Sequence, residues 1–257
     1  MSKIKINNLE FSYKDTKVFS GLNFTLKKGK SLSIIGGTGS GKTTLLKILD
    51  GKLEYDGEVF VNGLLIEPGN EVLKNIHVIY RDYSFITDTV KKEIMYYTKK
   101  CRVDYFKLVD SLNDYFNFNK LLRKKIIDLS KEEEVLIQII CNVIGKPMYL
   151  GIDDLLSYLS LRLKVLVLNY LEENNVILVN VTSNMEDVLY TDYLLCLYNG
   201  ISAIDGKVLD VLNNEQLLKR IGFSLPFLFD LSIQLKAYGM INKVYLSNEL
   251  LVSKLWK

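Results

Sequence analysis

The sequence has little of what builds a disulfide-linked or metal-binding protein. Among its 257 residues are 3 cysteines, Cys101, Cys141 and Cys196, which lie far apart and form no C-x-x-C motif. An odd, scattered set is typical of reduced thiols in the cytosol and excludes a disulfide framework or a zinc site. The single histidine, His77, lies in an apolar run, and we predict that it is structural.

Long apolar runs are also missing. The stretch 135–144 is interrupted by Gln138 and Asn142, whereas a helix that spans a bilayer needs about 20 mostly apolar residues. The first residues lack the apolar core of a secretory signal. We therefore expect a chain that is soluble or that is attached to a membrane through a partner protein.

The chain also has few prolines and no large excess of charge of one sign. The chain has 3 prolines and a formal net charge of +3, and we find no low-complexity linker and no internal repeat. This charge is too mild to indicate nucleic-acid binding by itself. With 48% apolar and 25% charged residues, the composition predicts one large globular domain, or one domain with a small appendage.

A glycine-rich segment at 36–43 is the most informative stretch that is present. It reads G-G-T-G-S-G-K-T and fits the phosphate-binding P-loop, G-x-x-x-x-G-K-[ST]. An apolar run precedes it and a helical pattern follows, so backbone N–H groups and a helix N-terminus are expected to face a phosphate. Glycine-rich turns without a ligand are the alternative. The candidate nucleotide ligands are Gly36, Gly37, Thr38, Gly39, Ser40, Gly41, Lys42, Thr43 and Thr44.

Two acids follow a second apolar run, at 148–152. Asp153 would lie at the carboxyl edge of a sheet beside the P-loop, where a carboxylate and the hydroxyl of Thr43 can hold Mg²⁺. Asp154 occupies the position of a general base for an attacking water. The alternative is that both acids cap a helix. The sequence thus predicts ATP and Mg²⁺ as ligands.

Strand and helix patterns alternate along the chain, which predicts an α/β fold with a parallel core sheet. We expect a P-loop NTPase with an antiparallel β subdomain, an inserted helical lobe and a C-terminal helical extension. The predicted strands lie at 3–13, 18–26, 32–35, 57–63, 76–80, 148–152, 176–181, 193–197 and 201–204, and the predicted helices at 44–49, about 89–125, 130–144, 161–173 and beyond about 212, with a break near Pro226.

The order of these features resembles that of ABC-transporter ATPases. The features that support this resemblance are the P-loop, the apolar run that ends at Asp153, the glycine turn Lys27–Lys30, and Leu129–Ser130 in the place of the family's Leu-Ser-Gly-Gly-Gln signature. Asp187 to Gly206 is similar to the family's closing helix and hairpin. The resemblance implies that Tyr13 stacks on adenine and that ATP lies between two ATPase chains, with Ser130 reaching the partner's nucleotide.

Within this family, residues 85–94 resemble a segment of energy-coupling-factor (ECF) and cobalt-type importer ATPases. The tail is similar to their C-terminal extension at 222–227, 248–251 and Leu255–Trp256, although a generic helical cap is an alternative for it. The implied domains are an ATPase domain at 1–215, with its helical lobe at about 85–145, and an extension at 216–257.

Several positions depart from the family pattern. The signature at 129–133 keeps Ser130 but has lost both glycines. Glu132 and Glu133 would oppose a triphosphate, stabilise the first helical turn, or do both. The catalytic glutamate is replaced by Asp154, and the switch histidine by Ser183. The expected glutamine falls on Tyr80 or Arg81, and the aspartate after the Walker B loop falls at Ser160.

The resemblance therefore implies a peripheral ATP-binding subunit at the cytoplasmic face of the membrane. It would be an ABC-type ATPase with weak hydrolysis at its own site, where the catalytic candidates are Asp154, Ser183 and Tyr80. The implied partners are a second ATPase subunit, a membrane coupling subunit and, indirectly, a substrate-binding membrane subunit. Nucleic acid is not among the implied partners. The alternatives are a non-hydrolysing ATP-dependent interaction module and a soluble ABC protein that acts on nucleic acid or ribosomes.

Overall fold

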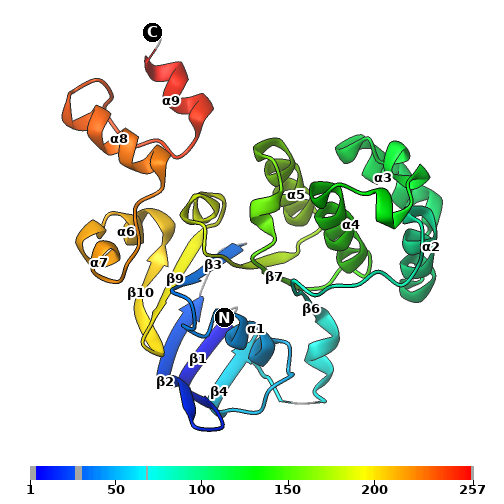
Figure 1. The fold of residues 1–257 in the computed structure, drawn as a ribbon, viewed down its shortest axis with the longest axis horizontal. Coiled ribbons are helices and arrows are strands. Elements are labelled where there is room, and N and C mark those ends of the chain that lie inside the picture. Colours follow the sequence, from blue (N-terminus) through cyan, green and yellow to red (C-terminus); the bar gives the residue numbers. More distant parts are fainter. Residues whose placement is uncertain (1–3, 27–30, 68, 256–257) are drawn as a thin grey trace.

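The computed structural model describes residues 4–26, 31–67 and 69–255. Two β-sheets lie at the centre, with helices gathered on either side of the larger one (Figure 1). The glycine turn expected at Lys27–Lys30 and the tail residue Trp256 lie outside the described residues.

The larger sheet carries the P-loop. Within the described residues it has six strands in the order β10-β9-β3-β8-β7-β6, of which all but β10 run parallel. Its inner strands are buried on both faces, which explains their continuous apolar sequences. The predicted α/β fold with a parallel core sheet is confirmed. The strands are β3 (Ser31–Gly36), β6 (Ile76–Ile79), β7 (Tyr149–Asp153), β8 (Ile177–Val181), β9 (Tyr193–Tyr198) and β10 (Ile201–Lys207).

The smaller sheet is antiparallel, as expected, with the order β2-β1-β4-β5 in the described residues. A tight turn joins its first two strands and pairs Tyr13 directly with Thr16. Gly57 adopts a φ of +98°, and a Cβ there would lie 2.3 Å from the carbonyl oxygen of Asn8, so only glycine fits. The strands are β1 (Ile4–Tyr13), β2 (Thr16–Leu26), β4 (Asp56–Val61) and β5 (Leu64–Leu65).

Helix α1 (Lys42–Leu49) packs between the two sheets in one apolar core with β1, β2, β3 and β4. On the other side, α4 and α5 share a core with β6, β7 and β8, and α2 and α3 extend it outward (Figure 1). These helices are α2 (Val90–Cys101), α3 (Tyr105–Phe116), α4 (Lys131–Val143) and α5 (Leu161–Glu173), with 3-10 turns η1 (Glu71–Asn75), η2 (Phe118–Arg123), η3 (Ile126–Asp128), η4 (Leu156–Tyr158) and η5 (Met185–Tyr190).

The C-terminal part consists of α6 (Val208–Leu212), α7 (Glu215–Arg220), α8 (Phe227–Ala237) and α9 (Asn248–Leu255). The break expected near Pro226 falls at the N-cap of α8. A boundary between residues 215 and 216 lies inside α7, whose Leu218 packs with β9 and α6. A separate small core joins α8 and α9 through Leu228 and Leu251.

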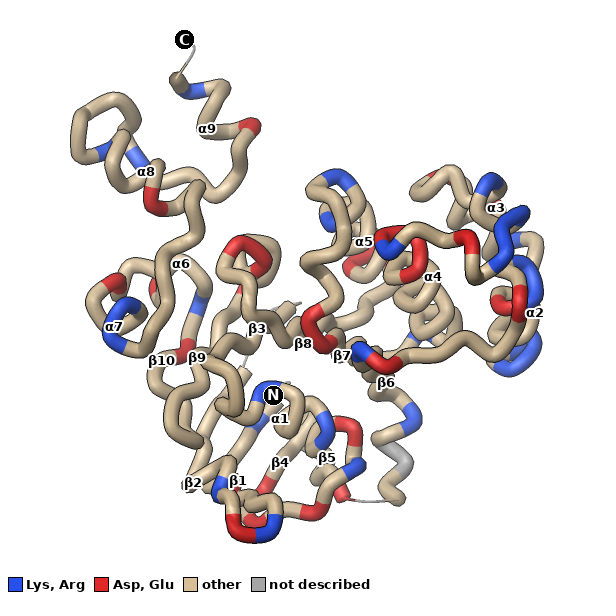
Figure 2. The backbone as a smooth tube through the Cα atoms, viewed as in Figure 1, with Lys and Arg blue, Asp and Glu red and all other residues tan. Residues whose placement is uncertain are grey.

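Charge is distributed unevenly over this fold. Figure 2 shows Lys and Arg gathered along α2, where Lys91, Lys92, Lys99 and Lys100 are exposed, whereas basic and acidic residues mix over much of the rest. The three cysteines form no disulfide. Among the described helices, none has the length and apolar character that a bilayer crossing requires.

Candidate functional site

A cavity of about 700 Å³ opens where the P-loop meets the carboxyl ends of the parallel strands. Three parts of the chain contribute to it: the β1–β2 hairpin, the P-loop with the start of α1, and the residues that follow β6, β7 and β8. Its described lining residues are Tyr13, Thr16, Val18, Thr38, Gly39, Ser40, Gly41, Lys42, Thr43, Thr44, Arg81, Asp153, Asp154 and Ser183.

Glycine shapes the loop at two places where nothing larger fits. Gly41, the N-cap of α1, has a φ of +95°, and a Cβ there would lie 2.7 Å from Val18 and 2.8 Å from Phe19. A Cβ on Gly36 would lie 2.1 Å from the hydroxyl of Ser40. The loop therefore packs closely against β2, and the N-terminus of α1 faces the cavity.

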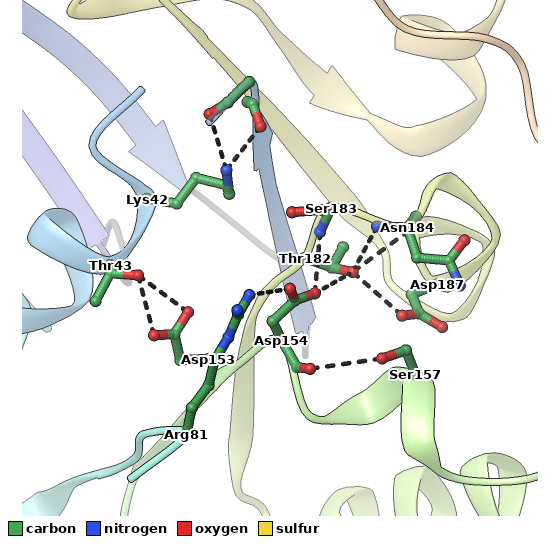
Figure 3. Close-up of polar contacts among 12 residues, drawn as sticks. Lys42, Thr43, Arg81, Asp153, Asp154, Ser157, Thr182, Ser183, Asn184 and Asp187 are labelled. Carbon is green, nitrogen blue, oxygen red and sulfur yellow. Dashed lines mark hydrogen bonds and ion pairs between the residues drawn. The ribbon is translucent and has the colours of Figure 1, made fainter. Parts of the chain in front are cut away.

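Lys42 folds back over its own loop. Its Nζ donates hydrogen bonds to the carbonyl oxygens of Gly36, at 2.7 Å, and Gly37, at 3.0 Å (Figure 3). Burial lowers the pKa of Lys42, and Asp154 and Asp153 partly oppose that shift. A cation held by two carbonyls at a helix N-terminus is available to an anionic ligand.

Asp153 ends β7 and is 5% exposed. The hydroxyl of Thr43 lies 3.1 and 3.0 Å from its two carboxylate oxygens. Burial raises the pKa of Asp153, while the Thr43 hydrogen bond and the nearby Arg81 act in the opposite direction. A carboxylate and a hydroxyl, adjacent and lining one cavity, are the hard oxygen donors that suit Mg²⁺.

Asp154 is held by several donors at once. Its backbone has a φ of +57°, and its N–H donates to the carbonyl oxygen of Val181 at 2.8 Å. Its carboxylate accepts from the backbone N–H of Ser183 at 3.1 Å and the Thr182 hydroxyl at 3.4 Å, and it forms an ion pair with Arg81 (Figure 3). These donors fix the carboxylate at the edge of the cavity.

A buried ion pair stabilises the segment after β8, which carries two of the donors to Asp154. Lys164 of α5 donates to Asp187 of η5 at 2.6 Å, and Asp187 is fully buried. The Thr182 hydroxyl lies 3.2 Å from the same carboxylate. The segment after β8 is thereby anchored to α5, which determines where the Ser183 N–H points.

Four of the expected site residues are not among those that line the cavity: Gly36, Gly37, Tyr80 and Ser130. The hydroxyl of Tyr80 donates to Asp50, at the end of α1, at 3.0 Å, and Lys52 lies over its ring. Ser130 is exposed at the start of α4, where it caps the helix and forms the predicted capping box with Glu133. Of the two positions weighed for the family's glutamine, Arg81 is the one that faces the cavity.

The acids of the altered signature have partners within the chain. Glu133 bonds to the Ser130 N–H and forms an ion pair with Lys124 at 2.6 Å. Glu132 accepts a hydrogen bond of 2.6 Å from the N–H of Ser160, the N-cap of α5. Both carboxylates therefore stabilise helix starts in this chain.

Sequence reasoning missed Thr16 and Val18, which line the cavity beside Tyr13. A signal was available, because Lys14–Asp15 forms a two-residue turn between strands and Tyr13 pairs with Thr16. The Thr44 hydroxyl lies 3.5 Å from the Tyr13 hydroxyl, which connects this hairpin to α1.

Comparison with known proteins agrees with this geometry. The chain is 28% identical over 247 residues to the energy-coupling factor transporter ATP-binding protein EcfA1 of Mycoplasmopsis pulmonis, covering 91% of this chain and 93% of that protein. It is 26% identical over 267 residues to EcfA1 of Ureaplasma parvum, covering 99% and 91%.

Solved structures share the fold. CbiO1 from Clostridium perfringens, described as part of the ABC transporter complex cbiONQ, superposes with a TM-score of 0.74 at 19% identity, over 86% of this chain and 94% of that one. The ADP conformation of MJ1267, an ATP-binding cassette of an ABC transporter, gives a TM-score of 0.72 at 19% identity, over 87% and 100%. The family model for ABC transporters matches residues 19–157, which include the P-loop, Asp153 and Asp154. Because this match covers more than half of the chain, the protein belongs to the ABC transporter family, as one of its ATP-binding domains.

Proposed function

We propose that this chain is the ATP-binding subunit of an ECF-type importer and that it binds Mg-ATP in the cavity beside the P-loop. The observation that carries the proposal is the meeting of Lys42, Thr43, Asp153 and Tyr13 around one cavity. The names of the EcfA1 relatives support the ECF assignment.

Different lining residues would bind the base, the phosphates and the metal ion. The aromatic ring of Tyr13 would stack on adenine, with Thr16 and Val18 beside it. The loop 36–41, the N-terminus of α1 and Lys42 would take the phosphates. Thr43 and Asp153 would hold Mg²⁺, which neutralises phosphate charge when bound. Thr43 would then give up its present contact with Asp153.

Hydrolysis at this chain's own site is proposed to be slow. The Asp154 carboxylate has one methylene less reach than the family's glutamate, and a small misplacement of a general base can cost about 10²-fold in rate. Ser183 offers a backbone N–H where the family has a histidine side chain. Tyr80 is directed toward Asp50.

The proposed assembly is a pair of ATPase chains at the cytoplasmic face of the membrane. In such a pair, Ser130 at the exposed start of α4 would approach the nucleotide of a second, more complete ATPase. A membrane coupling subunit would carry the movement to a substrate-binding membrane subunit. We also propose residues 1–215 as the ATPase domain and 216–257 as its extension.

Binding of a fluorescent trinitrophenyl-ATP tests the site directly. Lys42→Ala should weaken binding at least about tenfold, since a charge-assisted contact to phosphate is lost. Lys47→Ala, on the same helix but outside the cavity lining, is the matched control and should bind like the unaltered protein. Equal affinity of the Lys42 variant and the control would refute the P-loop assignment.

A second candidate is a module that closes on ATP and does not hydrolyse it, which the shorter Asp154 and the serine at 183 in place of a histidine favour. Single-turnover hydrolysis in the assembled complex, purified from host membranes through a tag on this chain, separates the two. Slow turnover together with a co-purified coupling protein and second ATPase supports the importer. Bound ATP that stays intact over many hours supports the module.

A further inference from the structure

Every charged group that lines the cavity is already engaged inside the protein. Lys42 is held by the loop carbonyls, Asp153 by Thr43, and Asp154 by Arg81 together with two weaker donors (Figure 3). A ligand with phosphate groups must therefore exchange these contacts for its own, and Arg81 is the group for which no role has yet been assigned.

Arg81 lines the cavity, whereas the preceding residue, Tyr80, does not. The Tyr80 side chain turns toward Asp50 at the end of α1, where Lys52 adds a second contact. The Arg81 side chain lines the cavity and meets Asp154. This packing under α1 selects residue 81 as the one that faces the site.

The charges of the described lining balance only if Arg81 is counted. Two cations, Lys42 and Arg81, face two carboxylates, Asp153 and Asp154. Without Arg81 the lining would be net negative and would repel a polyanionic nucleotide until a metal ion arrived. Arg81 thus supplies from within the chain part of the positive charge that such a site draws from its metal.

The Arg81–Asp154 pair can exchange at little cost. The Arg81 side chain is 63% exposed and that of Asp154 is 19% exposed, and ion pairs so open to water contribute little. A guanidinium gains more from a phosphate, which it can meet with two parallel hydrogen bonds. The balance therefore favours transfer of Arg81 from Asp154 to a phosphate.

The position of Arg81 points to the last phosphate of the nucleotide. Contacts in the lining connect Tyr13 to Thr44 at the start of α1, Thr43 to Asp153, and Asp154, the next residue, to Arg81. With the base at Tyr13, as the proposed function has it, the inner phosphates meet the P-loop. The terminal phosphate then falls at the edge that carries Arg81, Asp153 and Asp154.

We propose that Arg81 is a specificity-determining residue that pairs with Asp154 in the nucleotide-free protein and moves onto the terminal phosphate of a nucleoside triphosphate. The inference rests on the proposed function and adds to it a preference for triphosphate over diphosphate. It also gives the site a means of binding ATP before the metal arrives.

The test compares fluorescent methylanthraniloyl ATP and ADP, each titrated in Mg²⁺ and in EDTA. In EDTA, Arg81→Gln should weaken ATP-analogue binding about tenfold and ADP-analogue binding by less than about twofold, because only the triphosphate reaches residue 81. Arg81→Lys should recover part of the loss. Lys47→Gln removes a cation of α1 that lies outside the cavity lining and should leave both affinities unchanged.

Asp154→Asn gives an independent arm. It frees Arg81 from its carboxylate, so binding of the ATP analogue in EDTA should tighten, and combining it with Arg81→Gln should abolish that gain. The inference is overturned if Arg81→Gln lowers both affinities equally, or leaves both unchanged, while Lys42→Ala still weakens binding. Failure of the unaltered protein to bind either analogue would overturn the proposed function itself.

Discussion

At the level of single residues, Asp153 combines burial with charge. Burial raises the pKa of its carboxyl, so the folded protein holds this proton more tightly than the unfolded chain does. Its contribution to stability is therefore neutral below about pH 4, the ordinary range of an aspartate, and becomes unfavourable as pH rises through the folded-state pKa. A buried acid at this place costs stability, which agrees with its proposed role as a ligand of Mg²⁺.

Asp153→Asn should accordingly raise the melting temperature of the nucleotide-free protein at neutral pH. The gain should shrink as pH falls toward about 4, because both states are then protonated. Thermal unfolding followed by circular dichroism from about pH 4 to about pH 8 measures it. A gain of equal size at every pH would mean that ionisation of Asp153 is not its cause.

For Asp154 and Ser183, the proposed role is in catalysis. Replacing them together, Asp154→Glu with Ser183→His, should raise single-turnover hydrolysis of bound ATP at least about tenfold, since a positioned general base contributes more than that in other enzymes. Rapid quench of radiolabelled ATP measures the rate. If the rate does not change, the limit lies in the altered signature at 129–133 or in the partner chain.

Among the elements, the start of α2 depends on one buried acid. The Glu93 carboxylate is fully buried and accepts from the backbone N–H of Ile86 at 3.1 Å, and from the N–H and hydroxyl of Thr87 at 2.8 and 2.7 Å. Residues 85–94, which resemble the ECF segment, are thus a loop tied to its own helix.

Glu93→Ala should lower the free energy of unfolding by about 3 kcal/mol, because several buried donors lose their acceptor. Glu93→Gln keeps one acceptor oxygen and should lose less. Asp110→Ala, an exposed acid on α3, is the control and should stay within about 0.5 kcal/mol. Urea unfolding measures all three, and equal effects of Glu93→Ala and Asp110→Ala would contradict the role of this contact.

For the protein as a whole, the question is how the C-terminal helices are joined to the ATPase. Phe229 of α8 is fully buried in a core with β9, α6 and α7, whereas Leu251 of α9 belongs to a small core of its own. The Glu186 side chain also accepts from the Phe227 N–H at 2.6 Å, which links α8 to η5 near the cavity.

Phe229→Ala should therefore destabilise the whole chain by about 3 kcal/mol, the usual cost of a large cavity in a core. Hydrogen exchange should show lower protection in β9 as well as in α8. Phe227→Ala, two positions away but 71% exposed, should change neither. Loss of protection confined to α8 and α9 would mean that the extension unfolds as an independent unit.

Much of the site was predictable because its signals are local. The P-loop at 36–43 lies between its strand and helix, and Asp153 ends its strand as expected. The capping box of Ser130 and Glu133 formed as predicted, since its partners are three residues apart. Likewise, Asn199 and Gly200 both adopt positive φ at the predicted hairpin, as a two-residue turn requires.

Sequence could not determine which side chain after β6 faces the cavity, because that depends on the distant Asp50 and Lys52 holding Tyr80. Nor could it show that the Glu132 and Glu133 carboxylates would be taken up by Ser160 and Lys124. Periodicity and motif spacing report contacts within a few residues, and these were enough for the fold class and for the strand–loop–helix geometry around the P-loop. The partners of each charge come together only when sheet and helices pack, so the electrostatics of the site belongs to the tertiary structure.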